Sequence, residues 1–547
     1  MKYFYEKNRE LLDSSVNKTF EEILWMTKDQ FRQWVIDLRK TVVDLWDNKG
    51  NPPRVGYDES EIIEQFRQME SFSFKNFLVK DELTGEENVI RNTHTLGNAV
   101  NQFFPTMMKT RINYTKNDDG KSIYDYFSRD DLLDTFVTYA SRHFKRDSFY
   151  HYSSPVKLND TTVHGSLPVA QTGTDWIVQY ENEFRKRGEY AYWLSPKDVT
   201  KEYTGYNEEL KKQKFLVITK DEIESLGDRI PDECKTNVDY DKTTTYQIRA
   251  FKYGQKLFPI GLKAFRVSFC QYAVNFPPLT AKYLYERFTE EFKDQSLIRI
   301  YDPSSGWAGR LLGAMSIRDN RNVLYIGTDP NTDHTTSPGR TKYDEVADFY
   351  RKNVRKGGLW EIPHTQTEIY QLGSEVIGQN PDFQKHKGLV DFVFTSPPYF
   401  AKEAYSEDPE QSYKKFNQYA QWKEGFLRPT LITAVESLRP GRYLLWNIAD
   451  AKFGGDMLPL EKDSCDILEE LGMEFKGILK MSLAQMPGGN RVNETDEIEV
   501  YQEASLDGLL TKEKKVLKGK AKNMCQVNGT MLKYEPIFVF FKPIGTL

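Results

Sequence analysis

Hydrophobic positions in the second half of the chain follow two patterns that alternate along the sequence. Short apolar runs rich in β-branched and aromatic residues, at 297–301, 323–331 and 389–394, predict buried strands. Residues 281–288 and 310–315 have the composition of helices. Strands that alternate with helices are typical of a parallel sheet covered on both faces. We therefore expect an α/β fold with a Rossmann-like, doubly wound and mostly parallel sheet.

The N-terminal half has a less regular pattern. Residues 20–26 and 31–38 carry apolar groups at three- and four-residue spacing, which predicts helices. Residues 48–53, which include two prolines and a glycine, interrupt that pattern. Residues 71–206 mix polar, aromatic and turn-forming residues without a clear period, so this stretch indicates no particular fold.

The length of the chain, 547 residues, exceeds what one hydrophobic core usually serves. Together with the change of pattern, it predicts a mixed, partly helical N-terminal region at 1–264 and a second domain at 265–547. No apolar run approaches the ~20 residues that cross a bilayer, and residues 1–10 lack the apolar stretch of a signal peptide, so we expect a cytoplasmic protein. A net charge of −5 neither suggests nor excludes a nucleic acid as partner.

The residues between the predicted strand at 297–301 and the predicted helix at 310–315 form a glycine-bearing turn, Asp-Pro-Ser-Ser-Gly-Trp-Ala-Gly at 302–309. Glycines let a backbone bend sharply and approach a ligand, and the carboxylate of Asp302 is suited to attract a cationic group. The next strand ends in Asp329, the position at which nucleotide-binding folds place the acid that binds ribose hydroxyls. The turn alone is also compatible with ordinary packing, and Asp329 at the expected distance favours a nucleotide.

Two further strand ends carry polar residues. Residues 367–375 end in Ser374 and Glu375, which are candidates for contact with an adenine ring, although an ordinary strand end has the same composition. The strand at 389–394 runs into Thr-Ser-Pro-Pro-Tyr-Phe at 395–400, where two prolines end it abruptly. Ligands bind at the carboxyl ends of the central strands in open α/β sheets, so this segment is the strongest candidate for chemistry.

Residues 396–399, Ser-Pro-Pro-Tyr, resemble the catalytic motif of the amino-group DNA methyltransferases, which act on N4 of cytosine or N6 of adenine. Residues 302–309 resemble the S-adenosylmethionine motif of that family. The resemblance covers roughly residues 270–547, because 275–288 is similar to the helix beside the cofactor pocket and 534–540 resembles the closing antiparallel strand. The chain departs from the family at position 308, where alanine stands in place of the common glycine.

The resemblance implies a role for each residue of the catalytic motif. The Ser396 side chain and the Pro397 carbonyl would accept the two hydrogens of an exocyclic amino group, which directs its lone pair toward the methyl group. Pro398 would stiffen the loop, and Tyr399 would stack on a flipped-out base. The resemblance further implies that these residues bind S-adenosylmethionine: Pro278, Asp302, Ser304, Gly306, Gly309, Asp329, Pro330, Ser374, Glu375 and Thr395.

Double-stranded DNA is the partner that the resemblance implies. Candidate contacts to the base or the DNA are Phe400, Tyr405 and three lysines of a polar insertion near 486–530, namely Lys514, Lys515 and Lys518. Phe400 is also compatible with a core position, and the lysines with a solvated surface. The N-terminal region is expected to recognise DNA or a protein partner, and a prokaryotic or phage source with a restriction nuclease as partner fits the family.

Several alternatives stay open at this point. Serine at position 396 favours N4 of cytosine over N6 of adenine in the family, and both remain candidates. The four cysteines follow Glu233, Phe269, Ser464 and Met524, not a proline, which disfavours cysteine-dependent C5 methylation. Neither the cysteines nor the seven histidines show ligand spacing, so no metal is expected. Methylation of RNA or of a protein amide, and a catalytically silent DNA-binding protein of the same fold, are the competing functions.

Overall fold

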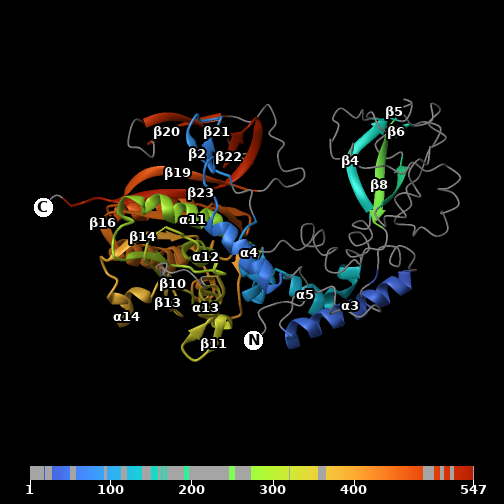
Figure 1. Ribbon diagram of the computed structural model, residues 1–547, viewed down its shortest axis with the longest axis horizontal. Coiled ribbons are helices and arrows are strands. Elements are labelled where there is room, and N and C mark those ends of the chain that lie inside the picture. Colours follow the sequence, from blue (N-terminus) through green and yellow to red (C-terminus); the bar gives the residue numbers. More distant parts are fainter. Residues whose placement is uncertain are drawn as a thin grey trace. The chain divides into compact units, whose positions relative to one another are not determined.

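The computed structural model of the chain divides into two compact units (Figure 1). The first combines residues 57–121 with 272–547, together with 1–4, and the second combines 5–56 with 122–271. The structure describes residues 16, 18, 28–49, 57–91, 95–112, 120–137, 273–319, 321–354, 365–483 and 523–545, and the backbone alone of 149–157, 162–163, 167–168, 190–195, 245–252, 498–504 and 511–517.

A mixed, mostly parallel sheet forms the centre of the first unit. Its strands are β1 (Leu78–Lys80), β2 (Glu87–Ile90), β9 (Ile298–Asp302), β10 (Val323–Thr328), β13 (Gln366–Tyr370), β14 (Val390–Thr395), β16 (Leu438–Asn447), β19 (Glu474–Ser482), β22 (Met524–Val527) and β23 (Thr530–Lys542). Their order is β1-β2-β19-β23-β16-β14-β9-β10-β13, with β22 paired to β23. Strands β13, β10, β9, β14 and β16 are mutually parallel, whereas β23 runs antiparallel to both β16 and β19. The predicted α/β fold and its antiparallel strand at 534–540 are confirmed.

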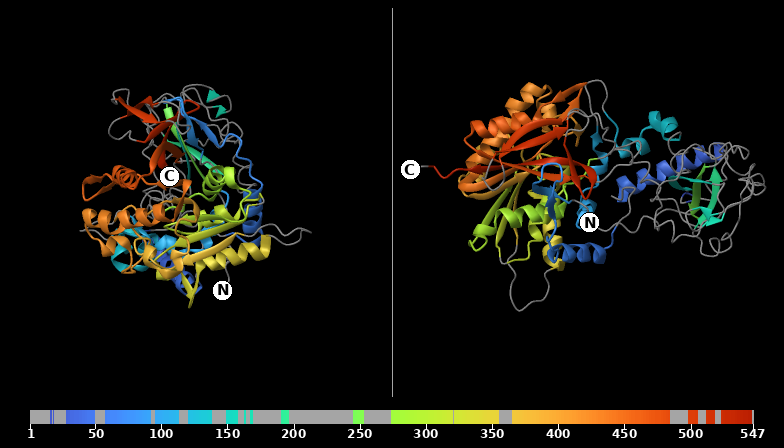
Figure 2. Two further views of the ribbon diagram at one scale, coloured as in Figure 1. Left: turned by 90° about the vertical axis from the view of Figure 1, so that its left-hand side faces the viewer. Right: turned by 90° about the horizontal axis from the view of Figure 1, so that it is seen from above.

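Helices cover both faces of this sheet (Figure 2). One face packs against α4 (Glu59–Glu70), α11 (Pro278–Phe288), α12 (Gly309–Met315) and α13 (Lys342–Val354), and the other against α14 (Pro381–Gln384), α16 (Tyr419–Trp422), the π-helical turn η8 (Lys423–Leu427), α17 (Arg428–Ser437) and α18 (Leu460–Glu470). Alternate residues of each strand therefore enter different cores: Phe392 and Phe394 of β14 join the first, and Val393 joins the second. This is why the strand sequences are apolar at nearly every position.

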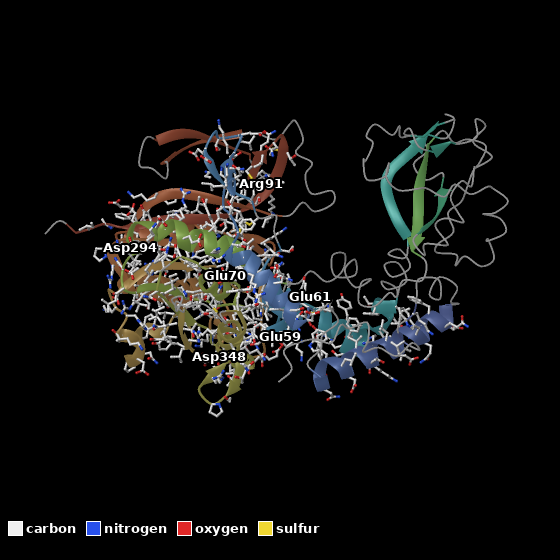
Figure 3. All side chains as sticks on the ribbon, viewed as in Figure 1. Glu59, Glu61, Glu70, Arg91, Asp294 and Asp348 are labelled. Atoms are coloured by element: carbon white, nitrogen blue, oxygen red, sulfur yellow. The ribbon has the colours of Figure 1, made fainter. Side chains whose placement is uncertain are left out.

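The predicted domain boundary at 264/265 is wrong, because residues 57–121 belong to the unit that contains the sheet. Apolar side chains of α4, including Phe66 and Met69, are buried in the core of the first face. The ammonium group of Lys282 in α11 donates to the backbone oxygens of Met69 and Glu70, which fixes the end of α4. Figure 3 labels Glu70 there and Glu59 near the start of the same helix.

Strands β1 and β2 extend the sheet beyond β19, to which β2 is parallel. A buried ion pair joins the two parts of the sequence, because the Lys480 Nζ of β19 lies 2.6 Å from a carboxylate oxygen of Asp81. An unpaired charge at such a position would be costly, so the pair ties the N-terminal strands to the sheet. The sequence pattern gave no sign of these pairings, because β1 and β2 span only three and four residues.

The remaining elements of the first unit are short. They are η1 (Asn98–Phe103), η2 (Pro105–Lys109), β3 (Arg111–Ile112), η5 (Glu290–Phe292), η6 (Thr332–His334), β11 (Thr335–Ser337), β12 (Arg340–Thr341), η7 (Ile377–Gln379), β15 (Glu403–Ala404), α15 (Ser412–Lys415), β17 (Ala451–Phe453), β18 (Asp456–Leu458), β20 (Ile498–Ala504) and β21 (Thr511–Leu517). Strands β20 and β21 form an antiparallel pair within the predicted lysine-rich insertion. No described helix is long and apolar enough to cross a membrane.

The second unit contains helices α3 (Lys28–Lys49) and α5 (Ile123–Ser128), the turn η3 (Asp130–Leu132), and strands β4 (Phe149–Lys157), β5 (Thr162–Val163), β6 (Leu167–Pro168), β7 (Tyr190–Ser195) and β8 (Thr245–Lys252). Helix α3 confirms the helical pattern at 31–38, whereas 20–26 lies outside the described residues. The buried Arg39 of α3 donates to the backbone oxygen of Tyr126 at 2.9 Å and so joins α3 to α5. Strands β4, β8 and β7 form an antiparallel sheet.

Candidate active site

The order of the strands reverses beside β9. The chain proceeds from β9 outward to β10 and β13, and then returns to place β14 on the other side of β9. Such a reversal leaves a crevice at the carboxyl ends of the two strands, which is where open α/β sheets bind ligands. Asp302 is the last residue of β9 and Thr395 the last of β14, and the Thr395 hydroxyl donates to Asp302 Oδ1 at 2.7 Å. The glycine turn and the Ser-Pro-Pro-Tyr segment are thus joined directly.

The Asp302 carboxylate is fully buried and has several internal donors. Its Oδ2 accepts from Arg310 Nε at 2.8 Å and from the Tyr325 hydroxyl at 2.5 Å, while Oδ1 accepts from the backbone NH of Ser304 at 3.2 Å and from Thr395. Burial is the main cause that raises the pKa of Tyr325 well above its ordinary value. These contacts give Asp302 the task of ordering the turn, which differs from the predicted attraction of a cationic ligand group.

The turn itself has two residues in the left-handed conformation, Gly306 with φ 57° and Ala308 with φ 59°. Gly306 is exposed, whereas Ala308 is completely buried. Gly309 lies so close to the preceding helix entry that a Cβ atom there would be 2.3 Å from the backbone oxygen of Phe276 and 2.7 Å from Asn275 Oδ1. Asn275 in turn donates to the backbone oxygen of Trp307 at 2.8 Å. Gly309 is therefore required for close packing, and Gly306 leaves its backbone open to a ligand.

Asp329 lies beside the same turn, directly after β10. The Tyr343 hydroxyl is 2.7 Å from Asp329 Oδ2 and 2.5 Å from the backbone oxygen of Gly306, and His334 Nδ1 is 2.5 Å from Asp329 Oδ2. The Asp329 side chain keeps 14% of its surface exposed, and the adjacent Pro330 is also partly exposed. The predicted ribose-binding acid and the exposed glycine of the turn are therefore neighbours, and both face solvent in part.

The N-terminal segment contributes to this part of the site in a way that the sequence did not indicate. The Phe104 ring packs edge-on against His334 with centroids 5.1 Å apart and lies 5.2 Å from the Tyr343 ring. Thr106 Oγ1 lies 3.1 Å from His334 Nε2. Because residues 71–206 have no clear period, no pattern marked these side chains in advance.

Three other residues predicted to bind the cofactor are buried with protein partners. Ser374 Oγ lies 2.9 Å from Thr430 Oγ1, and the Glu375 carboxylate accepts from Lys415 Nζ at 2.9 Å. Pro278 is the first residue of α11 and packs against Gly97, where a Cβ atom would lie 3.0 Å from its Cβ. Their direct role in cofactor binding stays a prediction.

The residues that follow β14 form a hydrogen-bonded series. The Tyr399 hydroxyl donates to the carboxylate of Glu535 in β23, and the Ser396 side chain lies close enough to Tyr399 to act on its pKa in the lowering direction. Pro397 is buried and Pro398 partly exposed, as expected for a stiff loop. Burial and the nearby carboxylate raise the pKa of Tyr399 well above its ordinary value, so its hydroxyl stays protonated. Glu535 was missed because its sequence context, a predicted closing strand, gives no functional signal.

Phe400 does not fit the predicted contact with a base. Its side chain is 1% exposed and its ring packs edge-on against Tyr419, Trp422 and Phe453, with centroids 5.1 to 5.8 Å apart. The core alternative is therefore the correct one. Its backbone has φ 56°, a conformation that is strained for a bulky residue and that the surrounding aromatic core holds in place.

Tyr405 lies between the two loops of the site. Its ring packs edge-on against Trp307 of the glycine turn at 5.7 Å, and its hydroxyl donates to the carboxylate of Glu403. Glu403 belongs to β15, which pairs with β3 of the N-terminal segment. Desolvation is the first cause that raises the pKa of Glu403 and of Glu535, and each residue is partly buried. The predicted contact of Tyr405 with a base is untested.

Of the predicted DNA-contacting lysines, Lys514 and Lys515 lie in β21, opposite Tyr501 and Val500 of β20. The positions of their side chains and the whole of Lys518 lie outside the described residues. Within the part of the chain that the structure describes, no group of three or more His, Cys, Asp or Glu side chains is arranged to hold a metal ion.

No protein-family model matches the chain, and no curated protein matches it. Among solved structures, the chain is similar to the CurJ carbon methyltransferase (11% identity, 49% of this chain and 54% of that one, TM-score 0.26). It is also similar to a proposed class I S-adenosylmethionine-dependent methyltransferase of Listeria monocytogenes (15% identity, 53% and 68%, TM-score 0.26) and to a proposed DNA modification methylase of Thermus thermophilus (17% identity, 32% and 54%, TM-score 0.18). The chain thus spans about half the length of the first of these proteins. All three TM-scores are low, so we assign the fold from the strand order of the chain itself.

Proposed function

We propose that this protein is an S-adenosylmethionine-dependent methyltransferase that modifies the exocyclic amino group of a base in DNA. The observation that carries the proposal is the contact between Thr395 and Asp302 at the reversal of strand order. It places the Ser-Pro-Pro-Tyr loop beside a glycine turn whose Gly306 is exposed and whose neighbour Asp329 is a partly exposed acid. A methyl donor and a methyl acceptor need two such adjacent sites.

The residues at the turn have the chemistry that a nucleoside cofactor requires. A backbone without side chain at Gly306 permits close approach, and the Asp329 carboxylate is an acceptor for ribose hydroxyls. When bound, S-adenosylmethionine supplies an activated methyl group on a sulfonium. The chain's own contribution is to hold that turn in one conformation through Asp302, Arg310 and Tyr343.

The Ser-Pro-Pro-Tyr loop has the chemistry to activate an amino nitrogen. The lone pair of an exocyclic amino group is delocalised into the base ring, and hydrogen-bond acceptors on its two hydrogens restore density to the nitrogen. The Ser396 hydroxyl oxygen, which lies near Tyr399, is the proposed acceptor of one hydrogen. The Pro397 carbonyl is the proposed second acceptor, held by two prolines that limit loop motion before the reaction. Transfer is then a direct displacement at the methyl carbon.

DNA is the proposed substrate because the motif is that of the amino-group DNA methyltransferases, with serine favouring N4 of cytosine. To reach such a loop, a base must leave the duplex, and the Tyr399 ring is the proposed stacking surface. Its hydroxyl donates to Glu535, which holds the outer end of the side chain in place. Methylation of RNA or of a protein amide is the alternative that the test below separates.

The proposal is tested by incubating the protein with methyl-labelled S-adenosylmethionine and, separately, unmethylated amplified DNA, RNA or a protein extract. We expect label in DNA, its loss in Ser396→Ala and Tyr399→Ala, and a cofactor affinity in both variants that is close to the wild-type value. Label confined to RNA or protein would overturn the proposal for DNA. Equal loss of cofactor affinity in both variants would make the loop structural.

A further inference from the structure

A line of hydroxyl groups leads from the Ser-Pro-Pro-Tyr loop to a carboxylate on a different strand. The Tyr399 hydroxyl donates to an oxygen of Glu535, and Ser396, three positions earlier in the same loop, lies close enough to Tyr399 to act on its pKa. Glu535 lies at the same edge of the sheet as the loop, because the last residue of β16, Asn447, is paired with Ile537 just two positions away. The loop follows β14, the neighbour of β16, so the three side chains meet at the carboxyl edge.

The direction of these hydrogen bonds is fixed by the carboxylate at their end. A carboxylate accepts only, so the Tyr399 proton points to Glu535 and the Tyr399 oxygen is left as an acceptor for the neighbouring Ser396 hydroxyl. With the Ser396 hydroxyl directed at Tyr399, both protons point away from the place proposed for the amino group. A series of hydroxyls aligned in this way is suited to move a proton toward the carboxylate.

The chemistry of amino methylation requires a place for one proton. When the nitrogen lone pair forms the bond to the methyl carbon, the bond from that carbon to sulfur breaks and its electron pair stays on sulfur. The nitrogen then carries a positive charge and one proton more than the product. Something near the nitrogen has to accept that proton.

We propose that Glu535 is the terminal acceptor of this proton, through Ser396 and Tyr399, an inference that rests on the proposed function. The amino proton passes to the Ser396 oxygen as the serine proton passes to Tyr399 and the tyrosine proton to Glu535. No hydroxyl is left ionised, and Glu535 ends as a neutral carboxylic acid. Because Glu535 acts through Tyr399, it is a positioning residue for the hydroxyls as well as a proton store.

The surroundings of Glu535 support this role. Desolvation and the nearby Glu403 carboxylate raise its pKa, while the Tyr399 hydrogen bond, Lys402 and Lys533 lower it, and the net direction is upward. A carboxylate with a raised pKa is a better proton acceptor near neutral pH than an ordinary one. Glu403 has a raised pKa of its own and accepts a hydrogen bond from Tyr405. Its charge raises the pKa of Glu535 from the side of the loop.

The test compares single-turnover methylation of DNA by the full-length wild type, Glu535→Gln and Tyr399→Phe across pH 5 to 9. Glutamine still accepts the tyrosine hydrogen bond and keeps the ring in place, but it is not a base. We expect about a 100-fold lower rate in both variants, as for loss of general base catalysis, with cofactor affinity kept. In the wild type the rate should fall as pH falls through the pKa of Glu535, and Glu535→Gln should lose that acidic limb.

A matched control removes the same groups at another tyrosine and glutamate pair. The Tyr370 hydroxyl donates to Glu368 at 3.1 Å on β13, so Tyr370→Phe and Glu368→Gln should leave the rate and the pH profile unchanged. Two neighbours of Glu535 should shift the acidic limb in opposite directions. Glu403→Gln removes a charge that raises the pKa and moves the limb to lower pH, whereas Lys402→Met removes one that lowers it and moves the limb to higher pH.

The outcomes separate this inference from the proposed function. A wild type that labels no DNA would overturn the proposed function, and the relay with it. An active wild type with a Glu535→Gln variant of equal rate and unchanged acidic limb would overturn the relay alone. A Glu535→Gln variant that is slow at every pH but keeps the acidic limb would also overturn it, because Glu535 would then only position Tyr399.

Discussion

Arg310→Met is the sharpest test of how the glycine turn is held. Arg310 and Asp302 form an ion pair in which the side chains are 4% and 0% exposed. Removing one partner of a buried pair costs about 3–5 kcal/mol, because the other charge is left without compensation. Asp302 keeps the hydroxyl donors of Tyr325 and Thr395, so we expect a loss of unfolding free energy near the lower end, about 3 kcal/mol. Methionine preserves the apolar volume of the arginine stem.

Urea unfolding followed by tryptophan fluorescence measures this loss, and calorimetric titration with S-adenosylmethionine measures the effect on the turn. Arg428→Met is the matched control, since Arg428 pairs with Glu424 and Glu470 at the surface and its loss should cost below about 1 kcal/mol. Adding Asp302→Asn to Arg310→Met should recover part of the stability, because both charges are then absent. If Arg310→Met cost no more unfolding free energy than the control, the buried ion pair would not be what stabilises the turn.

Three further predictions concern packing and reactivity. Ala308→Gly should raise the free energy of unfolding by up to about 1 kcal/mol. Glycine relieves the strain of the left-handed conformation at φ 59°, although it also increases the entropy of the unfolded chain. A lower urea midpoint would contradict this prediction. Gly309→Ala should destabilise the protein and weaken cofactor binding, because its Cβ would lie 2.3 Å from the Phe276 backbone oxygen, and a wild-type urea midpoint would speak against that close approach. Burial raises the pKa of Cys465, and raises that of Cys525 to about 12. Peptide mapping after iodoacetamide treatment at pH 8 should therefore find both thiols unlabelled in the native protein and labelled in urea. Labelling of the native protein would count against this burial.

The centre of the second half of the fold was accessible from the sequence because strands β9, β10 and β14 are buried on both faces. Residues 389–394, for example, are apolar except for Asp391 and fall in β14 almost residue for residue. Helix α11 was equally clear, since two prolines mark its entry. The contribution of residues 57–121 was not accessible, because β1 and β2 are too short for a periodic signal and their pairing with β19 depends on contacts far apart in sequence.

The site was predicted as a set of strand ends, and its function stays a prediction. The sequence placed Asp302 and the Ser-Pro-Pro-Tyr loop at the ends of two strands, and the structure shows that these strands are neighbours joined through Thr395. It did not predict that the Asp302 carboxylate would form an ion pair with Arg310. That pair depends on the turn, which brings position 310 close to position 302. Glu535 escaped prediction for a similar reason: a glutamate 136 positions from Tyr399 becomes its partner only when β23 inserts between β16 and β19.

The central claim is that the Ser-Pro-Pro-Tyr loop methylates an amino group of a DNA base. The most direct test is to incubate amplified, unmethylated DNA with the protein and S-adenosylmethionine, digest it to nucleosides and analyse these by mass spectrometry. We expect N4-methylcytosine or N6-methyladenine with the wild type and neither with Ser396→Ala. DNA that contains only 5-methylcytosine, or no modified nucleoside at all, would contradict it.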